Sequence, residues 1–274
     1  MYIDVKYFPD FIHKNIQVDN GISINTFIGG HGKEAILLLH GHPETHLIWR
    51  FLTPELCKYY TVVITDLRGY GDSSKPEGLP DHSNYSKRVM ADDQVKVMEK
   101  LGFSKFHTAG HDRGARVLHR MIIDHPDKIL SCTLMDIVST YDMYKETNQE
   151  FATKYWHWFF YIQGKGFPET CLSADPSRFI NYNLNLKIGP TARNKFPQEI
   201  LDEYTRCFSD YMTVHGICED YRASATIDME MDEPDRKKKI QTPILLLWGK
   251  DGVVVHWSTY FGHKISKIRC QKNK

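Results

Sequence analysis

The stretch that decides the fold is FHTAGHDRGARVLHRM, which runs from Phe106 to Met121. A short apolar run leads into Gly-His-Asp-Arg-Gly, and an amphipathic pattern of helical spacing follows, which predicts a strand, a tight turn and a helix. Gly110 and Gly114 flank Asp112 in a G-x-D-x-G arrangement, which is typical of a strained elbow that lifts one side chain above a sheet. A carboxylate there can attack a saturated carbon and leave an ester, whereas the alternative is an Asp that only caps the helix.

Apolar runs alternate with helical patterns along much of the chain. Strands are expected around Ile22–Phe27 and at Ala35–Leu39, Thr61–Leu67, Leu130–Ile137 and Pro243–Trp248, and a helix at Tyr85–Leu101. This alternation predicts an α/β fold with a mainly parallel sheet, whose ligands bind beyond the carboxyl ends of the strands. Asp112 and Asp136 both lie near such ends, so we expect them at the same edge of the sheet.

The composition changes after the strand that ends at Ile137. Residues 139–223 are rich in aromatic side chains and helical patterns, such as TKYWHWFFYI and PQEILDEYTRCF, and have no strong strand-like run. We therefore predict a helical cap at 139–223, inserted into a core made of residues 1–138 and 224–274.

Composition excludes several classes of function. Hydrophobic residues make up 41% and charged residues 25%, which are globular values. A net charge of +1 with dispersed Lys and Arg indicates no nucleic-acid partner, and no apolar run reaches membrane-spanning length. The six cysteines lack metal-ligand spacing, and no phosphate-binding glycine loop occurs. We expect a cytoplasmic protein without metal or organic cofactor, and leave a homodimer open.

Six motifs together give the sequence a family resemblance. They are HGHPET at 40–45, DLRGYGDSSKP at 66–76, GHDRGARV at 110–117, LMDI at 134–137, YWHWFF at 155–160 and CEDYRA at 218–223. Over about residues 20–252 the chain resembles the haloacetate (fluoroacetate) dehalogenase family of the α/β-hydrolase superfamily. The resemblance implies an α/β-hydrolase fold with helices on both faces of the sheet. Arg113 follows the elbow Asp, where epoxide hydrolases and haloalkane dehalogenases commonly have Trp.

The arginines after the elbow suggest a carboxylate substrate. Arg113 and Arg116 are three residues apart on the predicted helix, so their guanidinium groups can converge and clamp a carboxylate. The alternative is that both pair with acidic groups of the protein. The resemblance places His157, Trp158 and Tyr221 around the departing halide; the alternative for the aromatic run is that it only forms the core of the cap.

The resemblance also implies the groups that hydrolyse the ester. Asp136 matches the acidic partner of the general base, and Asp251, after the last strand, is its rival. The backbone N–H groups of His42 and Arg113 are expected to form the oxyanion hole, with the His42 side chain as a wall of the cleft.

The region of the general base departs from the family pattern. Family members have this histidine near the C terminus, after a further helix and strand. Beyond Val255 the sequence has no strand-like run, and Gly262-His263 is the nearest local match for the base, with His256 next. We expect a truncated or frameshifted C terminus that removes a strand and a helix and exposes an apolar sheet edge.

The predicted reaction is hydrolytic dehalogenation of a 2-haloacetate to glycolate and halide, through an aspartyl ester on Asp112. The missing base puts turnover in question. One alternative is an epoxide hydrolase, against which the two arginines argue. The other is a binding protein that keeps the cleft without catalysis.

Overall fold

One eight-stranded sheet forms the centre of the molecule. The computed structural model describes residues 3–186, 195–249, 254 and 268–270. The strands are β1 (Ile12–Asp19), β2 (Ile22–Gly29), β3 (Glu34–Leu39), β4 (Tyr60–Thr65), β5 (Phe106–His111), β6 (Ile129–Met135), β7 (Ile244–Leu247) and β8 (Ile268–Cys270). Their order is β1-β2-β4-β3-β5-β6-β7-β8. The pairs β1–β2 and β2–β4 are antiparallel, and all pairs from β4 to β8 are parallel, which confirms the predicted mainly parallel sheet.

Helices cover the sheet and form a separate group beside it. The α-helices are α1 (Ile3–Tyr7), α2 (Thr53–Leu56), α3 (Lys87–Lys100), α4 (Asp112–Asp124), α5 (Thr140–Lys145), α6 (Gln149–Lys154), α7 (Trp156–Tyr161), α8 (Phe167–Ser173), α9 (Pro176–Asn181), α11 (Gln198–Phe208), α12 (Tyr211–Ala225) and α13 (Ile227–Asp232). Short 3-10 or π turns are η1 (His46–Phe51), η2 (Ser83–Tyr85), η3 (Pro126–Lys128), η4 (Tyr182–Leu186) and η5 (Glu233–Lys237).

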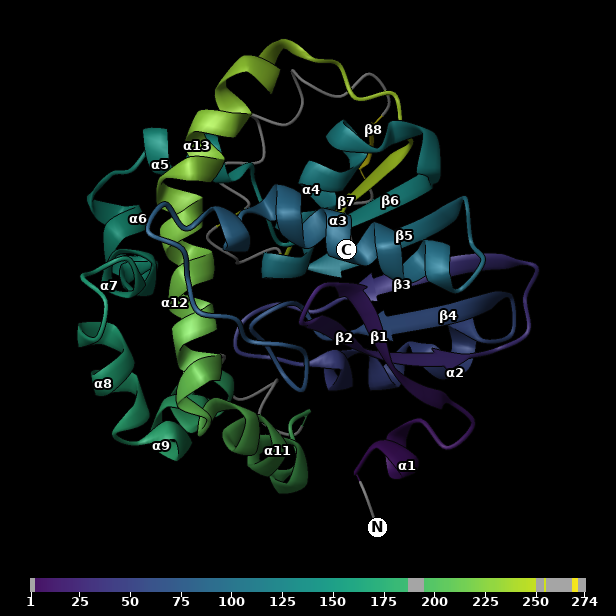
Figure 1. Ribbon diagram of the computed structural model, residues 1–274, viewed down its shortest axis with the longest axis horizontal. Coiled ribbons are helices and arrows are strands. Elements are labelled where there is room, and N and C mark those ends of the chain that lie inside the picture. The colour runs from purple at the N-terminus through teal and green to yellow at the C-terminus, as the bar shows by residue number, and fades with distance from the viewer. Residues whose placement is uncertain (1–2, 187–194, 250–253, 255–267, 271–274) are drawn as a thin grey trace.

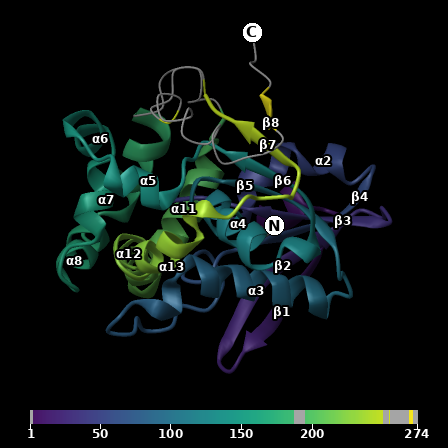
Figure 2. The same cartoon turned by 90° about the horizontal axis from the view of Figure 1, so that it is seen from above.

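The direction of the crossovers determines which face each helix covers. The connection from β3 to β4 moves one way across the sheet, and those from β4 to β5 and from β5 to β6 move the other way. Because parallel crossovers are right-handed, α2 lies on one face and α3 and α4 on the other (Figure 2). Helices α5 to α13 gather on one side of the sheet (Figure 1). The predicted cap of 139–223 remains a prediction, and its boundary would fall inside α12.

Most predicted elements occur within two residues of their expected bounds. Strands β4 and β6 end at Thr65 and Met135, each two residues before its predicted end. The aromatic pattern TKYWHWFFYI is divided at Tyr155 between α6 and α7. The expectation of no strand beyond Val255 was wrong, because β8 pairs with β7 from Ile268 onward. Three residues are too few to give a period-2 signal, so the sequence alone does not reveal this strand.

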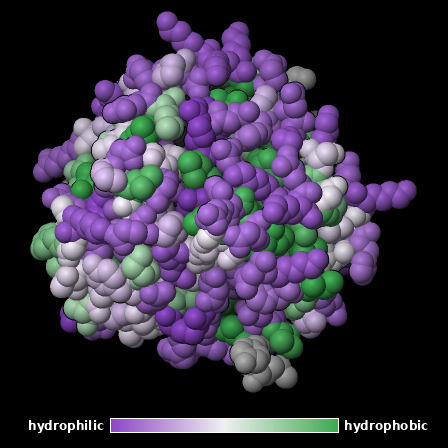
Figure 3. Space-filling model, viewed as in Figure 1, coloured by the Kyte–Doolittle hydropathy of each residue, from purple (hydrophilic) through white to green (hydrophobic). Residues whose placement is uncertain are grey.

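The core is built on strands that are buried on both faces. Ala35, Leu37, Leu38 and Leu39 of β3 are fully buried, as expected for a parallel strand covered by helices above and below. Burying one such leucine side chain contributes about 1.5–3 kcal/mol. The face in Figure 3 is mostly hydrophilic, and its hydrophobic side chains appear in small separate areas. None of the described helices combines the length and apolar character needed to cross a bilayer.

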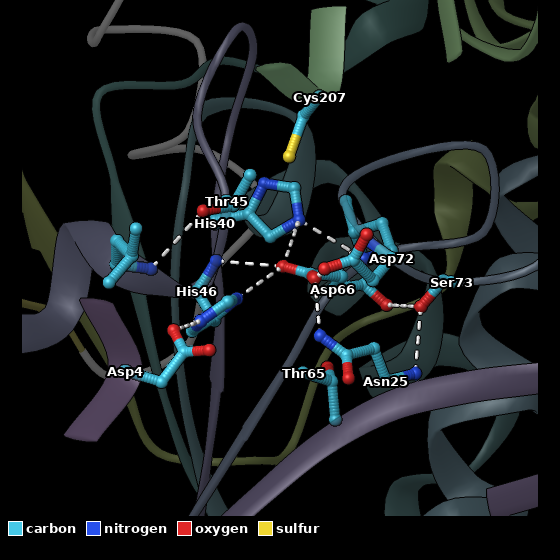
Figure 4. Close-up of polar contacts among 12 residues, drawn as sticks. Asp4, Asn25, His40, Thr45, His46, Thr65, Asp66, Asp72, Ser73 and Cys207 are labelled. Carbon is cyan, nitrogen blue, oxygen red and sulfur yellow. Dashed lines mark hydrogen bonds and ion pairs between the residues drawn. The ribbon is translucent and has the colours of Figure 1, made fainter. Parts of the chain in front are cut away.

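A buried ion pair ties the antiparallel edge of the sheet to its centre (Figure 4). Asp66 directly follows β4 and is fully buried. Its Oδ1 accepts a hydrogen bond from the His46 backbone N–H at 2.8 Å and lies 3.0 Å from the His46 Nδ1 atom. Its Oδ2 accepts from Asn25 Nδ2 at 2.7 Å and from the Asp72 backbone N–H at 3.1 Å. The second ring nitrogen of His46 lies 3.0 Å from Asp4 Oδ1, so this cluster also joins helix α1 to the sheet.

The cluster predicts a pH-dependent stability. Burial lowers the pKa of His46, but the charge of Asp66 and the bonds to Asp4 and Asp66 outweigh it and raise this pKa to about 10. A raised folded-state pKa stabilises the fold fully below about pH 6.5, the ordinary value, and this contribution is lost as the pH rises toward about 10. In urea titrations from pH 6 to 9.5, His46→Gln should cost about 3 kcal/mol at pH 6 and reduce the alkaline loss of stability. The control His31→Gln, at an exposed site, should keep the wild-type slope; an unchanged slope in His46→Gln would contradict the assignment.

Candidate active site

Asp112 occupies a tight elbow between β5 and α4. Its φ of +46° lies in the left-handed region that non-glycine residues rarely adopt. The glycines around it are needed because the backbones approach closely: a Cβ on Gly114 would lie 2.4 Å from the His40 carbonyl oxygen, and one on Gly41 would lie 2.6 Å from the Asp112 Cβ. The Gly114 N–H donates to the His40 carbonyl at 2.8 Å. The elbow therefore lies against the end of β3, where the direction of the sheet crossovers reverses and ligands bind in such folds.

The Asp112 side chain is half-buried, and its surroundings keep the carboxylate ionised. Its Oδ1 accepts a hydrogen bond from the His42 backbone N–H at 2.9 Å. Burial raises the pKa of Asp112, but the positive charges of His111, Arg113 and Arg116, together with the His42 bond, lower this pKa below its usual value. Since Oδ2 accepts no hydrogen bond from the described residues, one oxygen is anchored and the other is available.

His111 beside the elbow is positively charged at neutral pH. Burial lowers its pKa, but the Glu44 carboxylate outweighs that effect and raises the pKa to about 9. The Nδ1 atom of His111 lies 3.0 Å from Glu44 Oε2, which also accepts a hydrogen bond from the Gly41 N–H at 3.3 Å. Neither His111 nor Glu44 was predicted as a site residue from the sequence, although both belong to the quoted motifs.

Arg113 is held by a carboxylate of helix α12. Its Nε donates to Asp220 Oδ2 at 2.7 Å and its Nη2 to Asp220 Oδ1 at 2.7 Å. The Nη1 atom is buried without a hydrogen-bond partner among the described residues. Arg113 thus pairs with an acidic group of the protein, as the alternative interpretation held. That group, Asp220, is buried, and the contact leaves Nη1 of Arg113 without a hydrogen-bond partner among the described residues.

Arg116 has neutral partners only. Its Nη1 donates to the Val138 carbonyl at 2.8 Å and to Thr140 Oγ1 at 3.2 Å, and its Nε is buried without a partner. The guanidinium carbon lies 4.5 Å from the centroid of the Trp158 ring. Burial and the nearby charge of Arg113 lower the pKa of Arg116. Among the described residues no carboxylate hydrogen-bonds to this cation, and its Nε remains available to an acceptor.

The three residues expected at the halide lie together. The Trp158 and Tyr221 rings are 6.0 Å apart and those of His157 and Tyr221 6.1 Å. The Trp158 indole N–H is fully buried and finds no acceptor among the described residues. Tyr221 packs face-on against Arg113, with the guanidinium carbon 4.0 Å from its ring centroid. These donors therefore adjoin the arginine pair, and α7 and α12 contribute them.

Asp136 ends β6 on the same edge as Asp112. It too has a left-handed φ, of +57°, and its N–H donates to the Leu247 carbonyl at 2.8 Å. Burial raises the pKa of Asp136 despite the opposing charge of His111. Its Oδ1 is buried without a partner among the described residues. The rival acid Asp251 and the candidate bases His256 and His263 lie outside the described residues.

Tyr161 is a further site residue that sequence reasoning did not identify. Its hydroxyl lies 3.1 Å from Nε2 of His42, and its ring centroid lies 4.9 Å from that of Tyr221. His42 therefore bonds to Asp112 through its backbone N–H and contacts helix α7 through its side chain. The His42 side chain, which was expected to form a wall of the cleft, thus makes a polar contact with Tyr161 of α7. The only sequence signal is that Tyr161 lies one helical turn after His157 and Trp158.

A second buried cluster could be mistaken for a metal site. Glu169, His215 and Glu219 present ligand atoms within 4.8 Å of one another. Arg222 Nη1, however, donates to Glu169 Oε1 at 2.7 Å and to Glu219 Oε1 at 2.8 Å. Since a guanidinium group already neutralises these carboxylates, we assign no metal there.

Comparison with known proteins agrees with this geometry. The chain is 45% identical over 247 residues to fluoroacetate dehalogenase from Burkholderia sp., covering 90% of this chain and 80% of that protein. A crystal structure of ALR0039, an α/β hydrolase from Nostoc sp. PCC 7120, matches with a TM-score of 0.91 at 46% identity, covering 96% of this chain and 90% of that one. Epoxide hydrolase 4 from Mus musculus is 28% identical over 241 residues, 85% of this chain and 64% of that protein.

The matches assign the chain to a superfamily and, within it, to a family. A family model described as the alpha/beta hydrolase fold matches residues 34–264, in agreement with the sheet and with the elbow after β5. The chain belongs to this superfamily and, within it, to the haloacetate dehalogenase family represented by the Burkholderia enzyme.

The contact at Gly41 yields a stability prediction. A Cβ at this position would lie 2.6 Å from the Asp112 Cβ and 2.9 Å from its Oδ1. Gly41→Ala should therefore force the loop and the elbow apart and lower the free energy of unfolding by about 1–3 kcal/mol in urea titrations. Gly164→Ala is the matched control, because nothing lies within 4 Å of a Cβ there. Equal midpoints for the two variants would refute the tight contact.

Proposed function

We propose that this chain hydrolyses the carbon–halogen bond of a 2-haloacetate, giving glycolate and halide through an ester on Asp112. One observation supports this most: the half-buried, ionised Asp112 carboxylate lies near a buried arginine, Arg116, to which no carboxylate of the described residues hydrogen-bonds. A substrate carboxylate would give Arg116 a hydrogen-bonded counter-ion and hold the adjacent carbon near Asp112. Positioning of this kind can supply several kcal/mol of barrier reduction.

In the first step, Asp112 Oδ2 attacks the carbon that bears the halogen. A C–O bond forms as the carbon–halogen bond breaks, and its electron pair leaves with the halide. The His42 N–H on Oδ1 keeps the carboxylate oriented. We propose that the side chains of His157, Trp158 and Tyr221 donate to the developing halide, where hydrogen bonds stabilise the transition state more than the ground state.

In the second step, water adds to the carbonyl carbon of the Asp112 ester as the general base takes one of its protons. The bond from that carbon to the glycolate oxygen then breaks, the base returns the proton to this oxygen, and the second proton of the former water dissociates as the Asp112 carboxylate is restored. The His42 N–H already bonds to one oxygen of this carbonyl, and we propose that the backbone N–H of Arg113 joins it to form the oxyanion hole. Asp136, with its unpartnered Oδ1, is proposed to accept a hydrogen bond from a general-base imidazole. His263 and His256 remain candidate bases only on the basis of sequence.

An epoxide hydrolase is the second candidate, because the mouse relative bears that name. A neutral epoxide would not give Arg116 a hydrogen-bonded counter-ion, whereas a substrate carboxylate would. We therefore prefer the haloacetate. The cytoplasmic location and the homodimer stay predictions.

The covalent intermediate can be tested directly. After incubation with chloroacetate, the peptide containing Asp112 should increase in mass by a carboxymethyl ester, and a first equivalent of halide should be released. If no base activates water, the ester should persist, since general-base catalysis contributes about a hundred- to ten-thousandfold. Asp112→Asn is the control and should give neither product. Halide release from Asp112→Asn at the wild-type rate would contradict the proposed nucleophile.

The clamp can be tested with a matched arginine on the same helix. Arg113→Leu and Arg116→Leu should each weaken chloroacetate binding by about ten- to a hundredfold, because a hydrogen bond to a charged group contributes about 1.5–3 kcal/mol. Arg120 lies one turn further along α4 and bonds to Asp124, Asp232 and Asp235 instead. Arg120→Leu should therefore lower stability but leave chloroacetate binding of the folded protein intact. Normal binding in both clamp variants would exclude the proposed clamp.

A further inference from the structure

We propose that Asp220 is a positioning residue, which orients Arg113 so that one edge of its guanidinium group faces the substrate carboxylate. The inference rests on the proposed function, and it concerns a residue that contacts the arginine rather than the substrate. Asp220 lies on helix α12 immediately before Tyr221, whereas Arg113 lies on α4 immediately after the nucleophile.

Asp220 receives hydrogen bonds on both carboxylate oxygens. Oδ2 accepts from Arg113 Nε at 2.7 Å and from the Tyr70 hydroxyl at 2.8 Å. Oδ1 accepts from Arg113 Nη2 at 2.7 Å and also bonds to Lys87 Nζ. Asp220 is fully buried, so water does not compete for these positions. Four donors from three elements fix the carboxylate in one orientation.

This carboxylate in turn fixes the arginine. A bidentate contact through Nε and Nη2 sets both the position and the plane of a guanidinium group. Arg113 Nη2 additionally donates to the Asp220 carbonyl at 3.0 Å and to Ser224 Oγ at 2.6 Å. Of the Arg113 nitrogens, only Nη1 lacks a partner in the part of the chain that the structure describes, and the side chain is fully buried. A buried donor that lacks an acceptor is unfavourable, so binding of an anion at Nη1 would recover that cost.

The charge around Asp220 leaves the arginine attractive to an anion. One carboxylate faces two cations, since Lys87 Nζ and the Arg113 guanidinium both contact it. Asp228 lies 3.6 Å from Lys87 Nζ and shares the neutralisation of the lysine. Asp220 therefore holds Arg113 in place without fully cancelling its positive charge.

The same turn of α12 also contributes the Tyr221 ring, which lies 4.0 Å from the Arg113 guanidinium carbon. Asp220, which holds the proposed clamp residue Arg113, and Tyr221, which is proposed to contact the halide, are thus neighbours on the same helix. A shift of Asp220 would move both relative to Asp112.

A double-mutant cycle tests whether Asp220 acts through Arg113. The variants are Asp220→Asn, Arg113→Leu and the double variant. For each, the rate at which the first equivalent of halide is released is measured as a function of chloroacetate concentration. This measurement requires no sustained turnover. Asp220→Asn alone should raise the half-saturating concentration by about tenfold, with a smaller change in the limiting rate. In the Arg113→Leu background the same substitution should have almost no further effect.

The matched control is Asp93→Asn, because Asp93 is also buried and makes the same bidentate contact, but with Arg68 instead of Arg113. It should alter stability while the half-saturating concentration stays near the wild-type value. Should Asp220→Asn fail to fold, Asp220→Glu keeps the charge, displaces the carboxylate and enters the same cycle with the same expectation.

The outcomes separate this inference from the proposed function. No halide from the wild-type chain would refute the proposed function itself. A strong loss in Arg113→Leu with none in Asp220→Asn, or equal losses from Asp220→Asn in both backgrounds, would overturn the positioning role and leave the function standing.

Discussion

The rest of the site depends on keeping the half-buried Asp112 ionised. A carboxylate withdrawn from water tends to take up a proton, because desolvation disfavours its charged form. Here His111, Arg113 and Arg116 oppose the effect of burial, and each of these cations needs support of its own. Glu44 keeps His111 protonated, Asp220 holds Arg113, and the Val138 carbonyl with the Trp158 ring holds Arg116. Asp112 thus lies among three cations, two of which are held by a carboxylate and one by neutral groups.

Two buried ion clusters join parts of the chain that are far apart in sequence. Asp66 and His46 connect the end of β4 to the region after β3, and Asp4 extends the contact to α1. Asp220 connects α12 to α4 and, through Lys87, to the start of α3. Removing one partner of a buried pair is costly. The first cluster therefore holds α1 and the segment after β3 against the sheet, and the second restricts how α12 lies relative to α3 and α4. Because the second cluster bonds to Arg113, a displacement there would also move a donor that follows Asp112 in the chain.

The features that could be predicted from sequence are the local ones. The elbow at Asp112 follows from two glycines and a period change, and β3 follows from a continuous apolar run, because both depend on residues adjacent in the chain. The partners of Asp220 could not be predicted, since the cluster brings together side chains more than a hundred residues apart. The protonation of His111 likewise depends on Glu44, 67 residues away in the chain, and the position of the Tyr161 hydroxyl near His42 depends on packing of α7 against the segment after β3. Strand β8 was missed because three residues are too short for a pattern.

The two arginines are equivalent in the sequence but differ in the structure, and the difference bears on selectivity. Arg113 has a buried counter-ion that fixes its plane, whereas the hydrogen bonds of Arg116 in the described part of the chain go to neutral oxygens. A buried cation without a counter-ion is stabilised by any anion that fits beside it, and a neutral ligand offers no such gain. Arg113 is therefore suited to set direction and Arg116 to supply the charge that favours an anion. A carboxylate substrate satisfies both requirements at once, since one of its oxygens can meet the fixed edge of Arg113 while its charge neutralises Arg116.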